Sequence, residues 1–213
     1  MTWPHYAEAQ STYATHWTRY NEVLYSLAAE HPGHTNLPDV VAKVGIISRS
    51  YAAGAERHAA NGFVGLAEHL HANAILVDQI VAGLQTTAGA PEVYDSVSAL
   101  ASVTEHGRLC KLLAGATRGG NWLPSFASKY LHFHAPGVPI FDSRAAWRIR
   151  QPDFYPFRGR SVRRFTPPRV FDGRYYKFCN QFLAMWDDAV AAGLAVSVRS
   201  LDQYLLYLVD SNK

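Results

Sequence analysis

Three observations predict an all-α fold for this sequence. Apolar residues recur at the helical period of about 3.6 residues through most of the 213-residue chain. No segment combines sustained apolar–polar alternation with turn residues at the spacing of a hairpin, which is the pattern of paired strands. Proline, glycine and asparagine stand between the periodic segments, where helices begin or end. We therefore expect an all-α domain over residues 1–213, with one core or with two lobes that share a cleft.

The expected helices follow one another along the chain with few interruptions. Pro91 is expected near a helix start, because proline lacks the N–H that the first turn leaves unpaired. Asp142 has the residue type and position of an N-cap. The expected helices are 4–30, 38–62, 63–85, one or two within 90–117, a short helix that carries Lys129, one that begins after Asp142, 174–193 and 197–210.

Composition excludes several classes of protein. With 48% hydrophobic residues the chain is not intrinsically disordered, and no run reaches the roughly 18 apolar residues of a membrane span. The N-terminal residues have no basic flank before an apolar run, so we expect no secretory signal and a cytoplasmic protein, associated with the nucleoid if it is bacterial. Cys110 and Cys179 are expected to be reduced. Two cysteines are too few for a cysteine-bound iron–sulfur cluster, which usually takes four.

Arginine is concentrated in one part of the chain. From Arg144 to Arg174 there are nine arginines and two acidic residues. Because proline occurs at three sites within residues 151–172, we expect an irregular basic segment there. One interpretation is a solvated loop. The other is a phosphate-contacting surface, because guanidinium groups pair bidentately with phosphate oxygens and neighbouring aromatic rings can stack. On the second interpretation, Arg163 and Arg164 contact phosphate.

Histidine is plentiful, but its spacing argues against a metal site. His132 and His134, like His69 and His71, are two residues apart, which places them about 200° apart around a helix. The chain also lacks a phosphate-binding glycine loop and a Gly-x-Ser-x-Gly nucleophile elbow. We therefore expect no metal and no cofactor.

One lysine and one aspartate stand apart from the other charged residues. Lys129 lies inside an aromatic helix, and Asp142 is the only carboxylate between Glu105 and Asp153. The helix carries the chain about 9 Å beyond the lysine. Seven residues around a Pro-Gly turn can then span roughly 23 Å. The chain can therefore return and set Asp142 beside Lys129.

Two interpretations of this pair are open. A buried lysine with a lowered pKa can attack a sugar carbon and form a Schiff base, and a carboxylate beside it can stabilise positive charge or transfer protons. In the alternative, Lys129 extends its ammonium group to solvent and Asp142 only caps a helix. Physical reasoning from the residues favours neither.

The stretch FASKYLHFHAPGVPIFDSRAA, within residues 125–146, resembles the catalytic stretch of the helix-hairpin-helix DNA glycosylases, nearest to the 8-oxoguanine glycosylase-like branch. By this resemblance Lys129 takes the place of the Schiff-base nucleophile and Asp142 that of the essential aspartate. The family flips a damaged base out of the duplex. The resemblance implies a helical bundle of that type, with an active-site cleft between two helical lobes.

The chain departs from the family in two respects. The usual hairpin signature, Leu-Pro-Gly-[Val/Ile]-Gly, is absent, so Gly119 and Gly120 are the candidates for its tight turn. The spacing of 13 residues between Lys129 and Asp142 is shorter than the family's usual span.

We therefore predict a DNA glycosylase with AP lyase activity that removes a modified or oxidised base from double-stranded DNA, in repair or in defence against modified foreign DNA. The alternative is a non-catalytic DNA-binding or damage-sensing module on the same fold. No membrane association and no obligate protein partner is expected. The predicted base pocket consists of Trp122, Phe126, Tyr130 and Phe133, any of which can instead be a core residue, with Arg49 and Tyr51 suggested by the resemblance. The predicted DNA contacts are Gly119, Gly120, Arg144, Arg148, Arg158, Arg160, Arg163 and Arg164.

Overall fold

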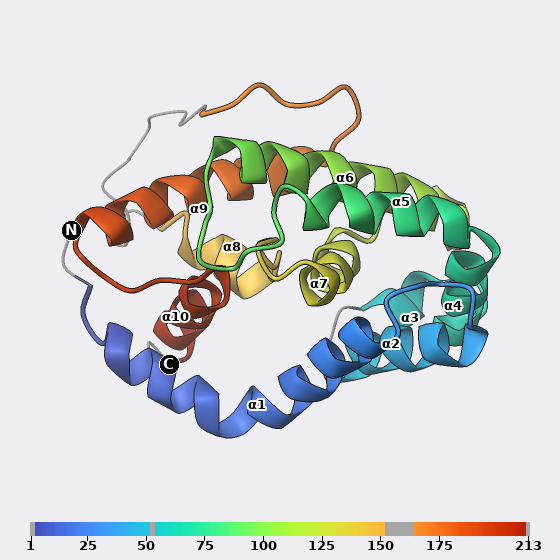
Figure 1. Ribbon diagram of the computed structural model, residues 1–213, viewed down its shortest axis with the longest axis horizontal. Helices are drawn as coiled ribbons and strands as arrows, with labels where there is room; N and C mark the ends of the chain where they lie inside the picture. Colours follow the sequence, from blue (N-terminus) through green and yellow to red (C-terminus); the bar gives the residue numbers. More distant parts are fainter. Residues whose placement is uncertain (1–2, 52–53, 152–163, 212–213) are drawn as a thin grey trace.

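The computed structural model of the chain describes residues 3–51, 54–151 and 164–211, with the side chains of all of these except residues 13–18. Within these ranges the regular structure is helical, apart from one isolated bridge between Ala59 and Thr117 (Figure 1). The predicted all-α class is confirmed. No helix in the described ranges combines the length and apolar character needed to cross a bilayer. The elements are α1 (Tyr6–Glu30), α2 (Leu37–Ser50), α3 (Ala55–His58), α4 (Gly62–Ala72), α5 (Ala74–Gln85), α6 (Ser96–Ala114), the 3₁₀ turn η1 (Arg118–Gly120), α7 (Pro124–His134), α8 (Ser143–Arg148), α9 (Gly173–Ala191) and α10 (Val198–Asp210).

Buried apolar side chains form two clusters. The N-terminal cluster is built mainly by α2, α4, α5, α7 and the second half of α6, and the C-terminal cluster mainly by α8, α9, α10 and the first half of α6. α6 joins them, because Leu113 belongs to the first cluster and Val103 to the second. α7 lies in the middle of the molecule, in contact with α1 and α2 on one side and with α5 and α6 on the other (Figure 1). The connection from α7 to α8 therefore passes from one cluster to the other.

The single helix expected over 63–85 is two helices, which meet at Asn73. The backbone of Asn73 has φ −111° and ψ 26°, and its side-chain amide donates a hydrogen bond to the carbonyl of His69 at 2.8 Å. The asparagine side chain thus competes for a carbonyl that would otherwise accept a bond of the helix backbone. The apolar period continues across this break.

Two further helix boundaries correct the expectation. The helix expected over 38–62 ends at Ser50, and Gly54, with a φ of 66°, precedes the four-residue α3. A φ in this region is one that glycine adopts without strain. Pro91 does not start a helix. α6 begins after Asp95, whose carboxylate accepts hydrogen bonds from two backbone N–H groups of the first turn, and this cap fixes the helix start.

Candidate active site

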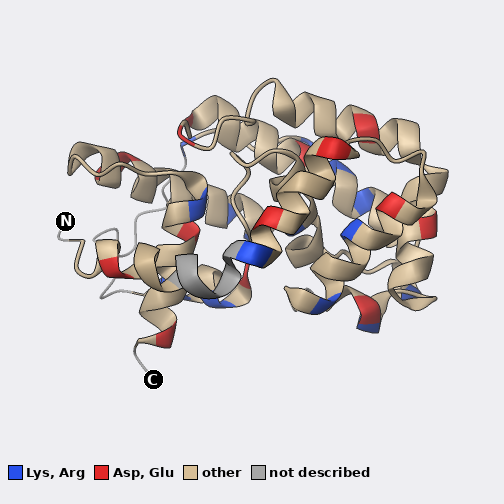
Figure 2. Cartoon of the chain, turned by 60° about the horizontal axis from the view of Figure 1, so that its bottom comes forward, with Lys and Arg blue, Asp and Glu red and all other residues tan. Residues whose placement is uncertain are grey.

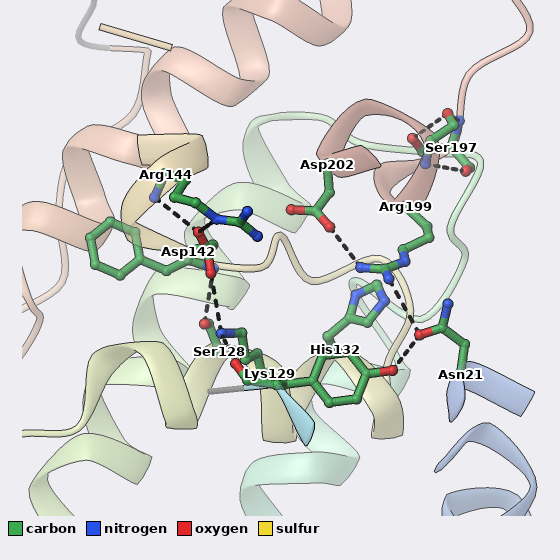
Figure 3. A network of polar contacts seen from close by, with 12 residues as sticks. Asn21, Ser128, Lys129, His132, Asp142, Arg144, Ser197, Arg199 and Asp202 are labelled. Atoms are coloured by element: carbon green, nitrogen blue, oxygen red, sulfur yellow. Dashed lines mark hydrogen bonds and ion pairs between the residues drawn. The ribbon is translucent and has the colours of Figure 1, made fainter. Parts of the chain in front are cut away.

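Lys129 and Asp142 meet at the junction of the two clusters (Figure 3). Lys129 Nζ lies 3.4 Å from Asp142 Oδ2, and 4% of the lysine side chain and 20% of the aspartate side chain are exposed. Their predicted proximity is confirmed. The two charges are paired largely out of contact with bulk water. A buried ion pair of this kind interacts more strongly than an ion pair on the surface.

Three acceptors surround the Lys129 amine. Besides Asp142, Nζ donates to the backbone carbonyl of Tyr51 at 2.9 Å and to Ser125 Oγ at 3.2 Å. Ser125 precedes Lys129 by four residues in α7, so the two side chains lie on one face of the helix. Tyr51 directly follows α2, so the amine also joins α7 to the end of α2. Each of the three ammonium hydrogens therefore has an acceptor.

The position of Asp142 is set by the connection between α7 and α8. Oδ1 of Asp142 accepts a hydrogen bond from the Arg144 N–H at 2.9 Å, so the predicted N-cap is confirmed and Oδ2 is left for the lysine. The connection itself is held at three points. The three hydrogen bonds run from His132 Nδ1 to the Val138 carbonyl (2.8 Å), from the Tyr175 hydroxyl to the Pro139 carbonyl (2.9 Å) and from the Phe141 N–H to Ser128 Oγ (2.9 Å).

Burial and pairing act in opposite directions on the two groups. Burial lowers the pKa of the Lys129 amine, and the Asp142 carboxylate opposes this shift. For Asp142, burial alone would raise the pKa, but the Lys129 ammonium and the Arg144 N–H hold it below its ordinary value. The Asp142 carboxyl group therefore loses its proton more readily than an ordinary aspartic acid, and the Lys129 ammonium loses its proton more readily than an exposed lysine. Once deprotonated, the amine can act as a nucleophile.

A further carboxyl group faces this pair from α10 (Figure 3). Asp202 is 1% exposed, and its Oδ2 accepts a hydrogen bond from Arg199 Nη1 at 2.6 Å. Arg199 Nη2 donates in turn to Asn21 Oδ1 at 3.3 Å, and Asn21 also accepts a hydrogen bond from the Tyr51 hydroxyl. The sequence did not predict these contacts. For Asp202 a signal was present, because its spacing of four from Val198 places a carboxylate on the apolar face of a helix.

His132 is neutral and has one tautomer. Its Nδ1 bonds the Val138 carbonyl, which can only accept, so Nδ1 carries the hydrogen and Nε2 accepts from the Tyr25 hydroxyl at 2.6 Å. Burial, reinforced by the charge of Arg199, lowers the pKa of His132 to about 3. The ring of His134 lies instead beside that of His34, with centroids 5.3 Å apart. The two histidines thus have different surroundings, as their spacing predicts.

Phe126 and Tyr130 are core residues, which corrects the prediction that they line a base pocket. Both are 0% exposed and belong to the N-terminal cluster. The Tyr130 hydroxyl donates to His34 Nε2 at 2.7 Å, so the polar end of this ring is also engaged inside the cluster. Trp122 is partly buried and packs against the same cluster. Aromatic residues at the helical period serve a core and a pocket wall equally well, so the sequence did not separate the two.

Of the other predicted pocket residues, Tyr51 lies beside the lysine and Arg49 does not. The Tyr51 ring packs against Phe133 with centroids 5.3 Å apart. Phe133 also lines a cavity of about 620 Å³ bounded by α1, α7 and the start of α10, but Lys129 is not among its lining residues. Arg49 is exposed and pairs with Glu56 at 3.0 Å.

The described arginines of the basic stretch differ in their exposure and in their partners. Arg144 is 48% exposed and pairs with Asp210 at 3.3 Å. Arg148 is 8% exposed, which corrects its prediction as a phosphate contact, and Arg164 pairs with Asp187. Basic and acidic positions are interspersed over the described chain (Figure 2). The predicted contacts Arg158, Arg160 and Arg163 lie outside the described residues.

Gly119 and Gly120 form a tight turn between α6 and α7. Their φ angles of 72° and 68° are in the left-handed region that favours glycine, and both residues are exposed. The predicted tight turn at these two glycines is therefore confirmed. Its contact with DNA stays a prediction.

Comparisons with known proteins do not assign the chain to a family. No protein-family model matches it, and no curated protein and no solved structure matches it either. The fold and the site define an all-α protein with a buried lysine–aspartate pair between two apolar clusters. The resemblance to DNA glycosylases rests on the sequence around that pair.

Proposed function

We propose that the protein is a DNA glycosylase with AP lyase activity, which removes a modified or oxidised base through a Schiff base on Lys129. The observation that carries this proposal is the buried 3.4 Å contact between Lys129 and Asp142. These are the two residues to which the resemblance assigns the chemistry. Burial favours the neutral, nucleophilic form of the amine, and the carboxylate lies where it can take up the proton.

In the proposed reaction, neutral Lys129 Nζ attacks C1′ of an extruded nucleotide. The bond from C1′ to the base breaks, and its electron pair leaves with the base. The attached nitrogen then loses a proton to Asp142. The C1′–O4′ bond breaks toward O4′, which takes this proton from Asp142, and the protonated Schiff base forms on Lys129. Loss of a C2′ proton breaks the C3′–O bond, which is the β-elimination step. The Asp142 carboxylate also stabilises the positive charge that develops on the sugar.

We place the duplex against α8, because this helix, which Asp142 caps, and the turn that follows it carry exposed groups suited to DNA. Arg144 and Arg150 are exposed, and Trp147 is 50% exposed. Guanidinium groups bind phosphate, and an exposed indole can stack on a base. Arg144 Nε lies 3.5 Å from Asp142 Oδ1. Entry of a nucleotide therefore displaces Arg144 from Asp142 toward the phosphates.

Borohydride reduction in the presence of a duplex with an abasic site tests the nucleophile. Wild type is expected to form a covalent adduct and Lys129→Met is not. Lys43→Met is the matched control, because Lys43 is 2% exposed and burial lowers its pKa to about 8, while Asp39 and Asp78 oppose the shift. Lys43 donates to two backbone carbonyls and not to a carboxylate. Adduct formation by Lys129→Met at the wild-type level contradicts the assignment, as does a loss confined to Lys43→Met.

The base is identified by release from a panel of duplexes. The panel carries 8-oxoguanine, uracil, an alkylated base and glucosylated hydroxymethylcytosine, and abasic-site formation is scored for each. Release of the glucosylated base points to defence against modified foreign DNA, and release of the oxidised or alkylated base points to repair.

A second candidate is a non-catalytic damage-sensing module. The observation that favours it is the 4% exposure of Lys129, whose three acceptors are also what a structural ion pair would have. This candidate predicts salt-sensitive duplex binding without base release. It also predicts no borohydride adduct in wild type, so the same assay decides between the two functions.

A further inference from the structure

The carboxyl group of Asp202 is buried but only half satisfied. Oδ2 accepts the hydrogen bond from Arg199, whereas Oδ1 is also buried and has no hydrogen-bond partner among the described residues. Buried polar atoms in proteins nearly always have a partner, so an open carboxyl oxygen requires an explanation. In the close-up view this oxygen is turned toward the side on which Asp142 and Arg144 lie (Figure 3). The open oxygen therefore faces the proposed reaction site.

We propose that Asp202 is the proton donor to the departing base. This inference rests on the proposed glycosylase function and adds a residue that turns the base into a good leaving group. A base that leaves C1′ takes the electron pair of the broken bond and becomes an anion unless a proton reaches it. The O–H of a neutral Asp202, on its open oxygen, delivers that proton.

Proton transfer from Asp202 accompanies the attack of Lys129 on C1′ and the departure of the base. Lys129 Nζ donates its lone pair to C1′, and the bond from C1′ to the base breaks toward the base. The O–H bond of Asp202 breaks toward the carboxylate as the proton joins the base. The products are a neutral base, a secondary ammonium group on C1′ and an Asp202 carboxylate, which Arg199 stabilises. Water returns a proton to Asp202 after the base has left.

The surroundings of Asp202 suit this role. Burial raises its pKa to about 6, Arg199 opposes the rise, and the negative charge of Asp142 adds to it. Asp142, by contrast, has a lowered pKa and stays ionised. Two carboxyl groups with pKa values displaced in opposite directions can divide the roles of acid and base. The charged or titratable groups whose charges act on Asp202, or on which it acts, include Arg199, Lys129, Asp142, Arg144, Tyr25 and Tyr51.

The proposal also constrains the substrate. The base must present a hydrogen-bond acceptor, a ring nitrogen or a carbonyl oxygen, toward α10 when its sugar lies beside Lys129. Oxidised and alkylated bases with such an atom on that side are expected to be released through Asp202.

Two assays that differ in whether a base departs test the proposal. Single-turnover release is measured on whichever duplex of the panel wild type cleaves, and borohydride trapping is measured on a preformed abasic site, which has no base to protonate. Asp202→Asn is expected to slow base release by about 100-fold or more at about pH 6. Trapping by the variant is expected to stay near the wild-type level. Asp202→Glu, which keeps an acidic proton, is expected to restore part of the release.

The pH dependence of base release distinguishes proton donation by Asp202 from a purely structural role of this residue. The ratio of wild-type to Asp202→Asn release is expected to fall by about tenfold per pH unit above about pH 6, because only protonated Asp202 acts. Equal release by the two proteins, or a ratio that does not change with pH, overturns the proposal. A loss of trapping as large as the loss of release also overturns it, because Asp202 would then act through Lys129. An absence of adduct in wild type refutes instead the glycosylase function itself.

Discussion

The hydroxyl of Ser128 accepts a hydrogen bond from the backbone N–H of Phe141 at 2.9 Å, which joins α7 to the residue before Asp142. Ser128 is 0% exposed, and it also donates to the carbonyl of Ser125 at 3.1 Å. Lys129 is the next residue in α7. Two consecutive residues of one helix therefore hold the amine and the segment that carries its carboxylate.

Ser128→Ala is expected to lower the free energy of unfolding by about 1–2 kcal/mol, because the buried N–H of Phe141 loses its acceptor. The loss is measured by urea unfolding. Thr104→Ala is the control, since the Thr104 hydroxyl bonds a carbonyl of its own helix at an exposed position. If Ser128→Ala is as stable as the control, the bond to Phe141 does not hold the connection.

His132 is expected to make stability depend on pH. Its folded-state pKa of about 3 lies below that of an unfolded histidine, about 6.5, so the folded protein binds fewer protons. The contribution of His132 to the free energy of unfolding is therefore complete above the pKa of an unfolded histidine. Below that pKa it decreases by about 1.4 kcal/mol for each unit by which the pH falls. His132→Asn, which keeps a donor for Val138, is expected to remove this share of the pH dependence.

Urea unfolding of wild type and His132→Asn gives, for each protein, the change in the free energy of unfolding between about pH 5 and about pH 7. His58→Asn, at an exposed position of α3, is the control and is expected to leave it unchanged. Nitrogen chemical shifts should also show the hydrogen of His132 on Nδ1 throughout this range. A protonated ring at about pH 5 would contradict the lowered pKa of His132, and a hydrogen on Nε2 of the neutral ring would contradict the assigned tautomer.

Local patterns predicted much of the fold. The helical period located α1, α7, α9 and α10, and the aspartate before α8 was predicted as its cap. These signals lie within a few residues of the feature they predict. The break at Asn73 was missed because it depends on one side chain competing with the backbone inside an unbroken apolar pattern. The start of α6 was expected at Pro91, because proline is common in the first turn of a helix, whereas the carboxylate of Asp95 caps the helix four residues later.

The candidate site was predictable only where it is local in sequence. Lys129 and Asp142 belong to one helix and the connection that follows it, so their spacing could be tested against chain geometry. The Tyr51 carbonyl comes from 78 residues earlier in the chain and Asp202 comes from α10. The pattern of α10 shows that Asp202 lies on an apolar helix face, but only the packing of the helices determines that Tyr51 and Asp202 lie near the lysine.

Arg144 in α8 and Arg150, which follows the end of α8, are expected to contact phosphate. Replacing Arg144 and Arg150 by alanine should weaken duplex binding for all sequences and reduce the slope of log affinity against log salt by roughly two. Arg108→Ala is the control, because Arg108 is 41% exposed on α6 and pairs with Glu105. Affinity is measured by fluorescence anisotropy over a range of salt concentrations. An unchanged slope in the double variant would place the duplex elsewhere.

The turn between α6 and α7 is expected to need glycine. Gly119→Ala and Gly120→Ala should each lower the free energy of unfolding by about 1 kcal/mol, because an L-residue is strained at these φ angles. No atom lies closer than 3.8 Å to an added Cβ at either position, so the cost is in the backbone. Gly173→Ala, where the added Cβ also meets no atom but φ is not left-handed, should be neutral or stabilising. A cost at Gly173 equal to that at Gly119 would contradict this account.

Asp142→Asn tests whether the carboxylate controls the protonation of Lys129. Asparagine caps a helix about as well as aspartate, so α8 keeps its start while the charge is lost. Burial lowers the pKa of Lys129 and Asp142 opposes that shift, so removing the charge should lower this pKa further. Trapping on a preformed abasic site needs the neutral amine. Its rate is therefore expected to rise at a lower pH in the variant than in wild type.

The direction of that shift separates two roles of Asp142. In the proposed reaction, base release also needs the carboxylate to take up a proton and to stabilise the sugar. The variant should therefore release base more slowly at every pH, even where its amine is more often neutral. Asp187→Asn removes an exposed carboxylate that pairs with Arg164, and it should leave both profiles in place. A trapping profile that stays at the wild-type pH, or moves upward, would show that Asp142 does not set the pKa of Lys129. Slower base release by the variant would then result only from the lost stabilisation of positive charge on the sugar.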